Sequence, residues 1–167
     1  MKQIDYQGQY FAICRDADGV ECVVTGDEVL IVPLLDNGNV LLTWEPSAAF
    51  DTQTLILPGG ETAPGRSHEE TAQLELQEEI GYKAGRLDFL GELHPFSKYL
   101  TVRSFVYLAR HLTPSWLVGD EGYEIGQESV ALADFESLIE QGILHDARVI
   151  AGLFLARNFV ERERVSD

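Results

Sequence analysis

The stretch from Leu57 to Tyr82 constrains this chain more than any other part of its sequence. It reads LPGGETAPGRSHEETAQLELQEEIGY, a glycine turn followed by a helical pattern and a second glycine. Ser67 and Glu70 have the spacing of a capping box, which predicts that a helix begins at Ser67. Gly81 is placed to end that helix. The sequence therefore predicts a helix with defined ends directly after a tight turn.

Three carboxylates, those of Glu75, Glu78 and Glu79, share one face of this predicted helix. At about 100° per residue, Glu79 lies about 40° from Glu75 on one side and Glu78 about 60° on the other. An apolar stripe lies roughly 100° round from Glu75; it consists of Ala72, Leu76 and Ile80. We therefore expect the carboxylates at the rim of the core, beside the buried stripe.

Like charges at this spacing repel each other by about 0.2–0.5 kcal/mol per pair in an isolated helix. A hard divalent cation with oxygen ligands removes that cost, and a backbone carbonyl of the PGG turn can reach the same ion. The pattern therefore suits Mg²⁺ or Mn²⁺. The alternative is a solvated acidic face in an acidic protein.

The charge and length of the chain limit its class and its partners. The 167 residues fit one domain with a full core. A net charge of -16 argues against nucleic acid as the main partner, because nucleic acid binding depends on cationic patches. We find no apolar run that could span a bilayer and no signal pattern at the start, so we expect a cytoplasmic protein without a membrane partner.

The order of the predicted elements is strands, helix, strands, helix, helix, without regular βαβ alternation. This order favours an α+β class, a mixed sheet flanked by helices. Before the central helix we expect two hairpins, one from residues 9–15 and 20–25 and one around Asn37-Gly38. After it we expect two long strands, a short strand, a helix ended by Gly142 and a C-terminal helix.

The two cysteines flank the turn sequence DADG. A three-residue Ala17-Asp18-Gly19 loop pairs residue 16 with residue 20 and places Cys14 opposite Cys22. A disulfide is conceivable in this arrangement. In a cytosolic protein we expect two reduced cysteines.

The Leu57–Tyr82 stretch resembles the Nudix box of the Nudix hydrolases, G-x5-E-x7-R-E-U-x-E-E-x-G-U, where U is aliphatic or aromatic. Gly60 takes the first position, and residues 75–82 match the end of the pattern. Two positions depart, since Arg66 replaces the family's glutamate and Leu74 its arginine. The resemblance extends over nearly the whole chain and is to the ADP-ribose and ADP-compound pyrophosphatase branch.

This resemblance implies a Nudix fold in one domain, residues 1–167. In that branch the N-terminal hairpin, here residues 1–26, helps to form a homodimer. The implied reaction is metal-dependent hydrolysis of a diphosphate that links a nucleoside to another group, with release of a nucleoside monophosphate. ADP-ribose, ADP-sugars and related dinucleotides are the expected substrates, and Mg²⁺ or Mn²⁺ the expected cofactor.

The family's site residues carry over at matching positions. Glu75 and Glu79 become the chief metal ligands, with Glu78 assisting, and the Gly59 carbonyl completes one ion's shell. In this branch the general base comes from a distal acidic loop, which here is GDEGYEI. Glu121 is then the base candidate and Glu124 a further metal ligand; the alternative for both is a solvated loop.

In the family, the glutamate and the arginine at these two positions help to fix the catalytic carboxylates; we call this pair the brace. Both residues are replaced here, and losses of this kind typically cost about 10–100-fold in metal affinity or activity. Arg66 is a candidate phosphate contact, or else an exposed arginine near the helix start. Leu74 projects away from the apolar stripe and needs a partner, either a loop or another subunit.

The remaining substrate-binding candidates are an aromatic residue and two cations. Trp44 or Phe50 could stack on a base, although ordinary packing is the alternative. Lys98 and Arg103 are the available cations for a phosphate, and Arg103 could equally be a solvated strand residue. The leading hypothesis is an active hydrolase. The alternative is a catalytically weak or inactive module that binds or senses a nucleotide. An RNA-directed enzyme is disfavoured by the charge.

Overall fold

The computed structural model describes residues 3–119, 122–123 and 125–166. Its elements, in chain order, are β1 (Gln3–Gln7), β2 (Ala12–Arg15), β3 (Glu21–Val24), β4 (Glu28–Pro33), β5 (Asn39–Ser47), β6 (Thr52–Ile56), β7 (Gly59–Glu61), α1 (His68–Glu79), β8 (Tyr82–Leu93), β9 (Ser104–Pro114), β10 (Gly126–Ala131), α2 (Glu136–Glu140) and α3 (Ala147–Ser166).

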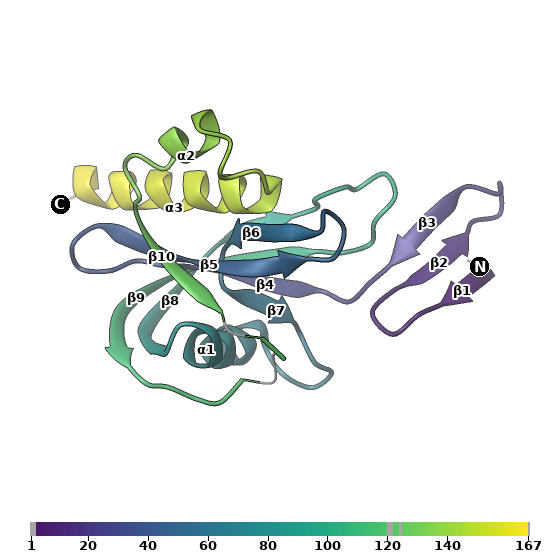
Figure 1. The fold of residues 1–167 in the computed structure, drawn as a ribbon, viewed down its shortest axis with the longest axis horizontal. Helices are drawn as coiled ribbons and strands as arrows, with labels where there is room; N and C mark the ends of the chain where they lie inside the picture. Colours follow the sequence, from purple (N-terminus) through teal and green to yellow (C-terminus); the bar gives the residue numbers. More distant parts are fainter. Residues whose placement is uncertain (1–2, 120–121, 124, 167) are drawn as a thin grey trace.

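A four-stranded mixed sheet, in the order β7-β4-β9-β8, forms the centre of the molecule. Strands β4 and β9 are parallel, and their neighbours are antiparallel. Helices α1 and α3 lie on opposite sides of this centre (Figure 1). Because side chains alternate along a strand, β4 turns Val29 and Ile31 toward α1, and Leu30 and Val32 toward α3. The predicted α+β architecture with a sheet between helices is confirmed.

Strands β4 and β5 do not form the predicted second hairpin. The turn itself is present, because Gly38 has a positive φ of 85° and its N–H donates to the Leu35 carbonyl at 3.0 Å. Beyond one isolated bridge, β5 leaves β4 and joins a separate sheet, β10-β5-β6. Strand β4 pairs instead with β7 and β9, which are distant in sequence.

The N-terminal residues form a third sheet, β1-β2-β3, which projects from the rest of the molecule (Figure 1). The predicted hairpin of β2 and β3 is confirmed, with the Asp16 N–H donating to the Val20 carbonyl at 3.0 Å. Strand β1 was not expected from the sequence. Its side chains are all exposed, so it lacks the alternation of buried and exposed residues by which strands are recognised.

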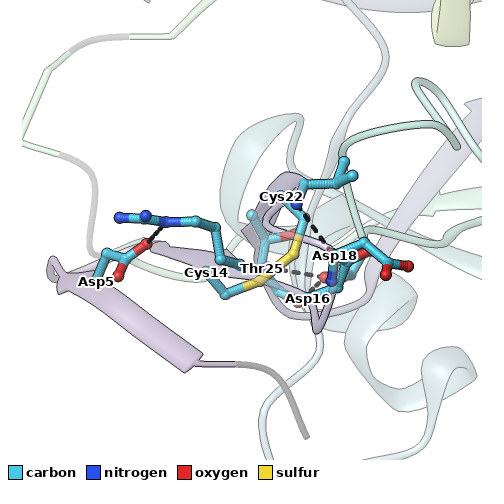
Figure 2. The surroundings of a disulfide bond; sticks show 9 residues. Asp5, Cys14, Asp16, Asp18, Cys22 and Thr25 are labelled. Carbon is cyan, nitrogen blue, oxygen red and sulfur yellow. Dashed lines mark hydrogen bonds and ion pairs between the residues drawn. A yellow bond between two sulfur atoms is a disulfide. The ribbon is translucent and has the colours of Figure 1, made fainter.

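The two cysteines are bonded to each other, which corrects the expectation of reduced thiols. Cys14 and Cys22 face each other across β2 and β3, with their Cα atoms 5.2 Å apart (Figure 2). This separation lies within the range that a disulfide spans. The register of the hairpin therefore brings the two sulfur atoms together, whereas the expectation of free thiols depended on an assumed cellular compartment.

The C-terminal helices close the core on the α3 side. Phe135, Leu153 and Ala156 are fully buried there. Gly142 follows α2 with a positive φ of 68°, as expected for the residue that ends a helix. Within the described residues, no helix combines the length and the apolar character needed to cross a membrane.

Candidate active site

The predicted ends of α1 are confirmed. Ser67 is the N-cap, its Oγ accepts the Glu70 N–H at 3.1 Å, and the Glu70 carboxylate accepts the Ser67 N–H at 2.9 Å. After Ile80, Gly81 has a positive φ of 74°. The predicted apolar stripe is buried against Val29 of β4 and its neighbours in one cluster. The core therefore fixes the rotation of α1 and turns its carboxylate face toward β7.

Glu79 lies at the junction of α1 and the glycine turn. It is only 3% exposed, and its Oε2 accepts the Gly59 N–H at 3.1 Å. A buried carboxylate is costly unless hydrogen bonds or a cation compensate its charge. The contact fixes the Glu79 side chain beside Gly59, whose carbonyl is the predicted metal ligand.

Glu75, one turn earlier on α1, packs against the other glycine of the turn. A Cβ on Gly60 would come within 2.5 Å of Glu75 Oε1. Gly59 cannot carry a side chain, because its Cβ would collide with the Val29 carbonyl of β4. Gly60 thus leaves room for the Glu75 carboxylate, and Gly59 leaves room for the backbone of β4.

These residues fit a divalent cation in donor chemistry. Two carboxylates and a carbonyl are hard oxygen donors, and Mg²⁺ is commonly held by one or two carboxylates together with water and substrate phosphates. Glu78 lies half-buried beside them on α1. Among the described residues, no three His, Cys, Asp or Glu side chains form a ready-made metal cage.

The predicted general base and one predicted metal ligand belong to the distal acidic loop. Glu121 and Glu124 lie outside the described residues, so their roles as base and metal ligand stay predictions.

The two departures from the box are at the N-terminal side of the site. Arg66 is exposed in the turn before α1, where its N–H donates to the Ala63 carbonyl at 3.1 Å, and it borders a shallow depression with Glu70. Leu74 is half-buried on α1. Arg66 and Leu74 cannot pair as a glutamate and an arginine at these positions could.

Trp44 is not brought together with the α1 carboxylates. Its ring packs against the hydrophobic cluster on the α3 side, and its indole N–H donates to Glu128 Oε2 at 2.8 Å. Its neighbours Thr43 and Glu45 occupy the other face of β5. Trp44 thus packs as the alternative to base stacking expects, and its role in substrate binding stays a prediction. Phe50, the other aromatic candidate, is 82% exposed.

The two candidate cations, Lys98 and Arg103, lie in the loop between β8 and β9. Arg103 forms an ion pair with Asp27, its Nε lying 3.0 Å from Oδ1, and its guanidinium lies 5.5 Å from the Phe105 ring centre. The hydrogen bonds that Arg103 donates to Asp27, and then the charge of Asp27, raise the pKa of Arg103. Lys98 Nζ lies 5.1 Å from the Tyr99 ring centre. Arg103 is thus already paired with a carboxylate of this chain.

Sequence reasoning missed a polar face on β5. Thr43 is fully buried, and Glu45 accepts hydrogen bonds from Thr43 Oγ and from the Tyr123 hydroxyl, both at 3.0 Å. Gln127 pairs with Thr43 in register and donates to the Glu79 carbonyl at 3.3 Å. This face therefore points toward the end of α1. The alternation of polar residues at 43 and 45 was the available signal.

The fold, the glycine turn and the carboxylate helix together define a recognisable class of protein. The sequence profile of the NUDIX domain matches residues 24–151. The chain therefore belongs to the Nudix family, and the predicted Nudix fold is confirmed. Nudix hydrolases generally use divalent metal ions, in agreement with the oxygen donors described above.

Two relatives show which part of the family this chain resembles. ADP compounds hydrolase NudE of Escherichia coli (strain K12) is 32% identical over 135 residues, which cover 81% of this chain and 72% of NudE. A crystal structure of an ADP compounds hydrolase matches with a TM-score of 0.82 at 27% identity, covering 98% of this chain and 93% of that one. The predictions of a Nudix pyrophosphohydrolase and of its ADP-compound pyrophosphatase-like branch are confirmed.

Proposed function

We propose that this chain hydrolyses the diphosphate of an ADP-linked compound, such as ADP-ribose or an ADP-sugar, and releases AMP. The observation that carries the proposal is the pair of contacts at the glycine turn. Glu79 accepts the Gly59 N–H, and Glu75 packs against Gly60. The box carboxylates thus keep defined positions although Arg66 and Leu74 have replaced the brace. The name of the relative NudE supports an ADP-linked substrate.

Glu75, Glu79 and the Gly59 carbonyl would hold Mg²⁺ or Mn²⁺, with Glu78 assisting. A divalent ion at this place neutralises the diphosphate and lowers the pKa of a water molecule. Glu121 would accept the proton of the attacking water, and Glu124 would add a carboxylate ligand. Arg66 and Lys98 are the proposed phosphate contacts, since Arg103 is paired with Asp27.

The test is a hydrolysis panel of ADP-ribose, ADP-sugars and dinucleoside diphosphates with either metal, with AMP measured by chromatography. Glu79→Gln should abolish AMP release. The control Glu140→Gln, at the exposed last residue of α2, should leave it unchanged. Turnover of none of these compounds with either metal would refute the proposal.

A second candidate function is nucleotide binding without cleavage, which the replacement of both brace residues favours. Calorimetry distinguishes the two. Tight metal-independent binding of an intact ADP-linked ligand, together with no AMP release, would support the binding module.

We also propose a homodimer in which the β1-β2-β3 sheet makes the contact, residues 1–26 being an extension of one domain that spans residues 1–167. Ile4, Tyr6, Tyr10 and Phe11 are 60, 55, 73 and 45% exposed on this projecting sheet, and exposed apolar side chains gathered in one place mark interaction surfaces. Sedimentation should give twice the chain mass, and a monomer at micromolar concentration would contradict the proposal.

We also propose that the chain is located in the cytoplasm, and the redox state of the two cysteines tests this location. Disulfides are rare in reducing compartments. The bonded Cys14–Cys22 pair of this structure therefore weighs against the cytoplasm. Counting alkylated thiols after rapid quenching of intact cells decides, since largely reduced thiols would support a cytoplasmic location. A fully oxidised pair would argue against that location.

A further inference from the structure

The side of α1 that faces away from Glu75 is held by two glutamines. Gln73 and Gln77 each lie about 160° round the helix from Glu75, one on either side. Gln73 makes two hydrogen bonds to the backbone of Ala84 in β8: its Nε2 donates to the carbonyl at 2.8 Å, and its Oε1 accepts the N–H at 3.1 Å. This pair attaches the middle of α1 to the central sheet.

Gln77 attaches the next turn of α1 to the segment that follows β9. Its Oε1 accepts the Ser115 hydroxyl at 2.9 Å, and its backbone carbonyl accepts the Leu117 N–H at 3.1 Å. Its Nε2 donates to the Gln73 carbonyl at 2.8 Å, so the two glutamines are linked. The side chain and the carbonyl of one residue thus bind two residues of the segment 115–117.

Trp116, between these two contacts, covers the glycine that ends α1. A Cβ on Gly81 would run into the Trp116 ring, and the Ser115 N–H donates to the Gly81 carbonyl at 2.8 Å. Trp116 remains 65% exposed, so it is placed on the surface of the helix end rather than in the core. We name the contacts of Gln77, Gly81, Ser115, Trp116 and Leu117 the C-terminal clamp.

The clamp lies close to Glu79 along the helix. Gln77 precedes Glu79 by two residues, and Gly81 follows it by two. A shift of this turn would move Glu79 Oε2 away from the Gly59 N–H. The family's brace acts from positions 66 and 74, whose present residues cannot form it, while the clamp acts from the other end of α1.

We propose that Gln77 and Trp116 are positioning residues, which hold Glu79 against Gly59 and replace the missing brace. The metal-binding part of this inference rests on the proposed function. The hydrogen bond between Gly59 and Glu79 does not depend on it, so the two can be tested separately.

The test compares Trp116→Ala and Gln77→Met with two controls in the full-length protein. Trp116→Phe keeps an aromatic ring over Gly81. Val118→Ala removes an apolar side chain that is 89% exposed in the same segment. Mn²⁺ affinity is measured by electron paramagnetic resonance, and exchange of the Gly59 amide by NMR, both well below the unfolding temperature of each variant.

Trp116→Ala and Gln77→Met should each weaken Mn²⁺ binding by about 10–100-fold, as is usual when residues that support metal ligands are lost. Both should also speed exchange of the Gly59 amide, while both controls stay close to the wild type. Folded variants with unchanged Mn²⁺ affinity and unchanged Gly59 exchange would overturn the proposal. If Trp116→Ala does not fold, the Mn²⁺ affinity and the Gly59 exchange of Gln77→Met alone test the proposal.

The two failures remain distinguishable. If the wild type binds no Mn²⁺, the proposed metal-dependent function fails, and Gly59 exchange alone decides whether the clamp positions Glu79. If the wild type binds Mn²⁺, and the variants bind it equally well with unchanged exchange of the Gly59 amide, only the clamp proposal fails.

Discussion

Glu75 lies against Gly60 so closely that a methyl group on Gly60 would come within 2.5 Å of the Glu75 carboxylate. The Gly60→Ala substitution should therefore displace Glu75. We expect AMP release to fall by about 10–100-fold and the free energy of unfolding to change little, because the displaced carboxylate is the end of a flexible side chain. Initial rates at several metal concentrations and urea denaturation measure the two effects.

The control for Gly60→Ala is the same substitution in a Glu75→Gln background. If the alanine acts by moving Glu75, it should lower the rate little further in that background, because contacting residues are not additive. Fully additive losses would show that Gly60 acts in another way.

Glu79→Gln separates the charge of this side chain from its hydrogen bond. The amide oxygen of glutamine can still accept the Gly59 N–H, so the thermal midpoint should change little. Loss of the negative charge should weaken metal binding and lower the rate by at least about 100-fold, at the upper end of the losses seen for supporting residues. A rate within a few-fold of the wild type would contradict a ligand role for Glu79.

The missing brace can be restored by combining Arg66→Glu with Leu74→Arg. Since the clamp already positions α1, we expect the restored pair to raise wild-type activity by less than about threefold. In a Trp116→Ala background the restored pair should raise the activity by about tenfold or more, within the range of effects seen for residues that support metal ligands. Equal gains in both backgrounds would show that the brace and the clamp act independently.

Reduction of the Cys14–Cys22 disulfide should loosen the N-terminal sheet and leave the rest of the fold largely unaffected. The two cysteines are 8 residues apart in the sequence. A disulfide that closes a loop of this length stabilises the fold by about 2–3 kcal/mol, because it lowers the entropy of the unfolded chain. Hydrogen exchange of β2 and β3 should accelerate in dithiothreitol, whereas α1 should exchange as before. A Cys14→Ser/Cys22→Ser variant should not respond to the reductant, and unchanged exchange in β2 and β3 of the wild type would contradict the prediction.

Tyr107 should titrate later than an ordinary tyrosine. Burial, then the charge and the hydrogen bond of Glu69, whose Oε1 accepts the Tyr107 hydroxyl at 3.2 Å, raise its pKa to about 12. Because the folded state favours the neutral phenol, the raised pKa of Tyr107 stabilises the fold. This stabilisation is complete below about pH 10 and is lost as the pH rises from 10 to 12.

Near-ultraviolet titration of phenolate absorbance measures this pKa. Tyr107→Phe should remove the delayed step of this titration, and Glu69→Gln should shift that step to lower pH. If Glu69→Gln leaves the titration unchanged, the carboxylate has no influence on Tyr107.

Local sequence determined the parts of this protein whose interactions span a few residues. The capping box at Ser67, the stop at Gly81, the turn at Gly38 and the facing positions of Cys14 and Cys22 all involve neighbours in the chain. Their geometry follows from residue type and spacing, and each is present in the structure. The carboxylate face of α1 follows from the helix period in the same way.

Tertiary structure alone decided which distant segments meet. An apolar run such as β4 is compatible with several partners, and only packing of the whole chain selects β9, which pairs Glu28 with Ser104. The hydrogen bonds of Gln77 to Ser115 and Leu117 depend on the same long-range choice, and so does the placement of Trp44 on the α3 side. The sequence by itself therefore determined which carboxylates α1 presents, and the fold decided what holds them in place.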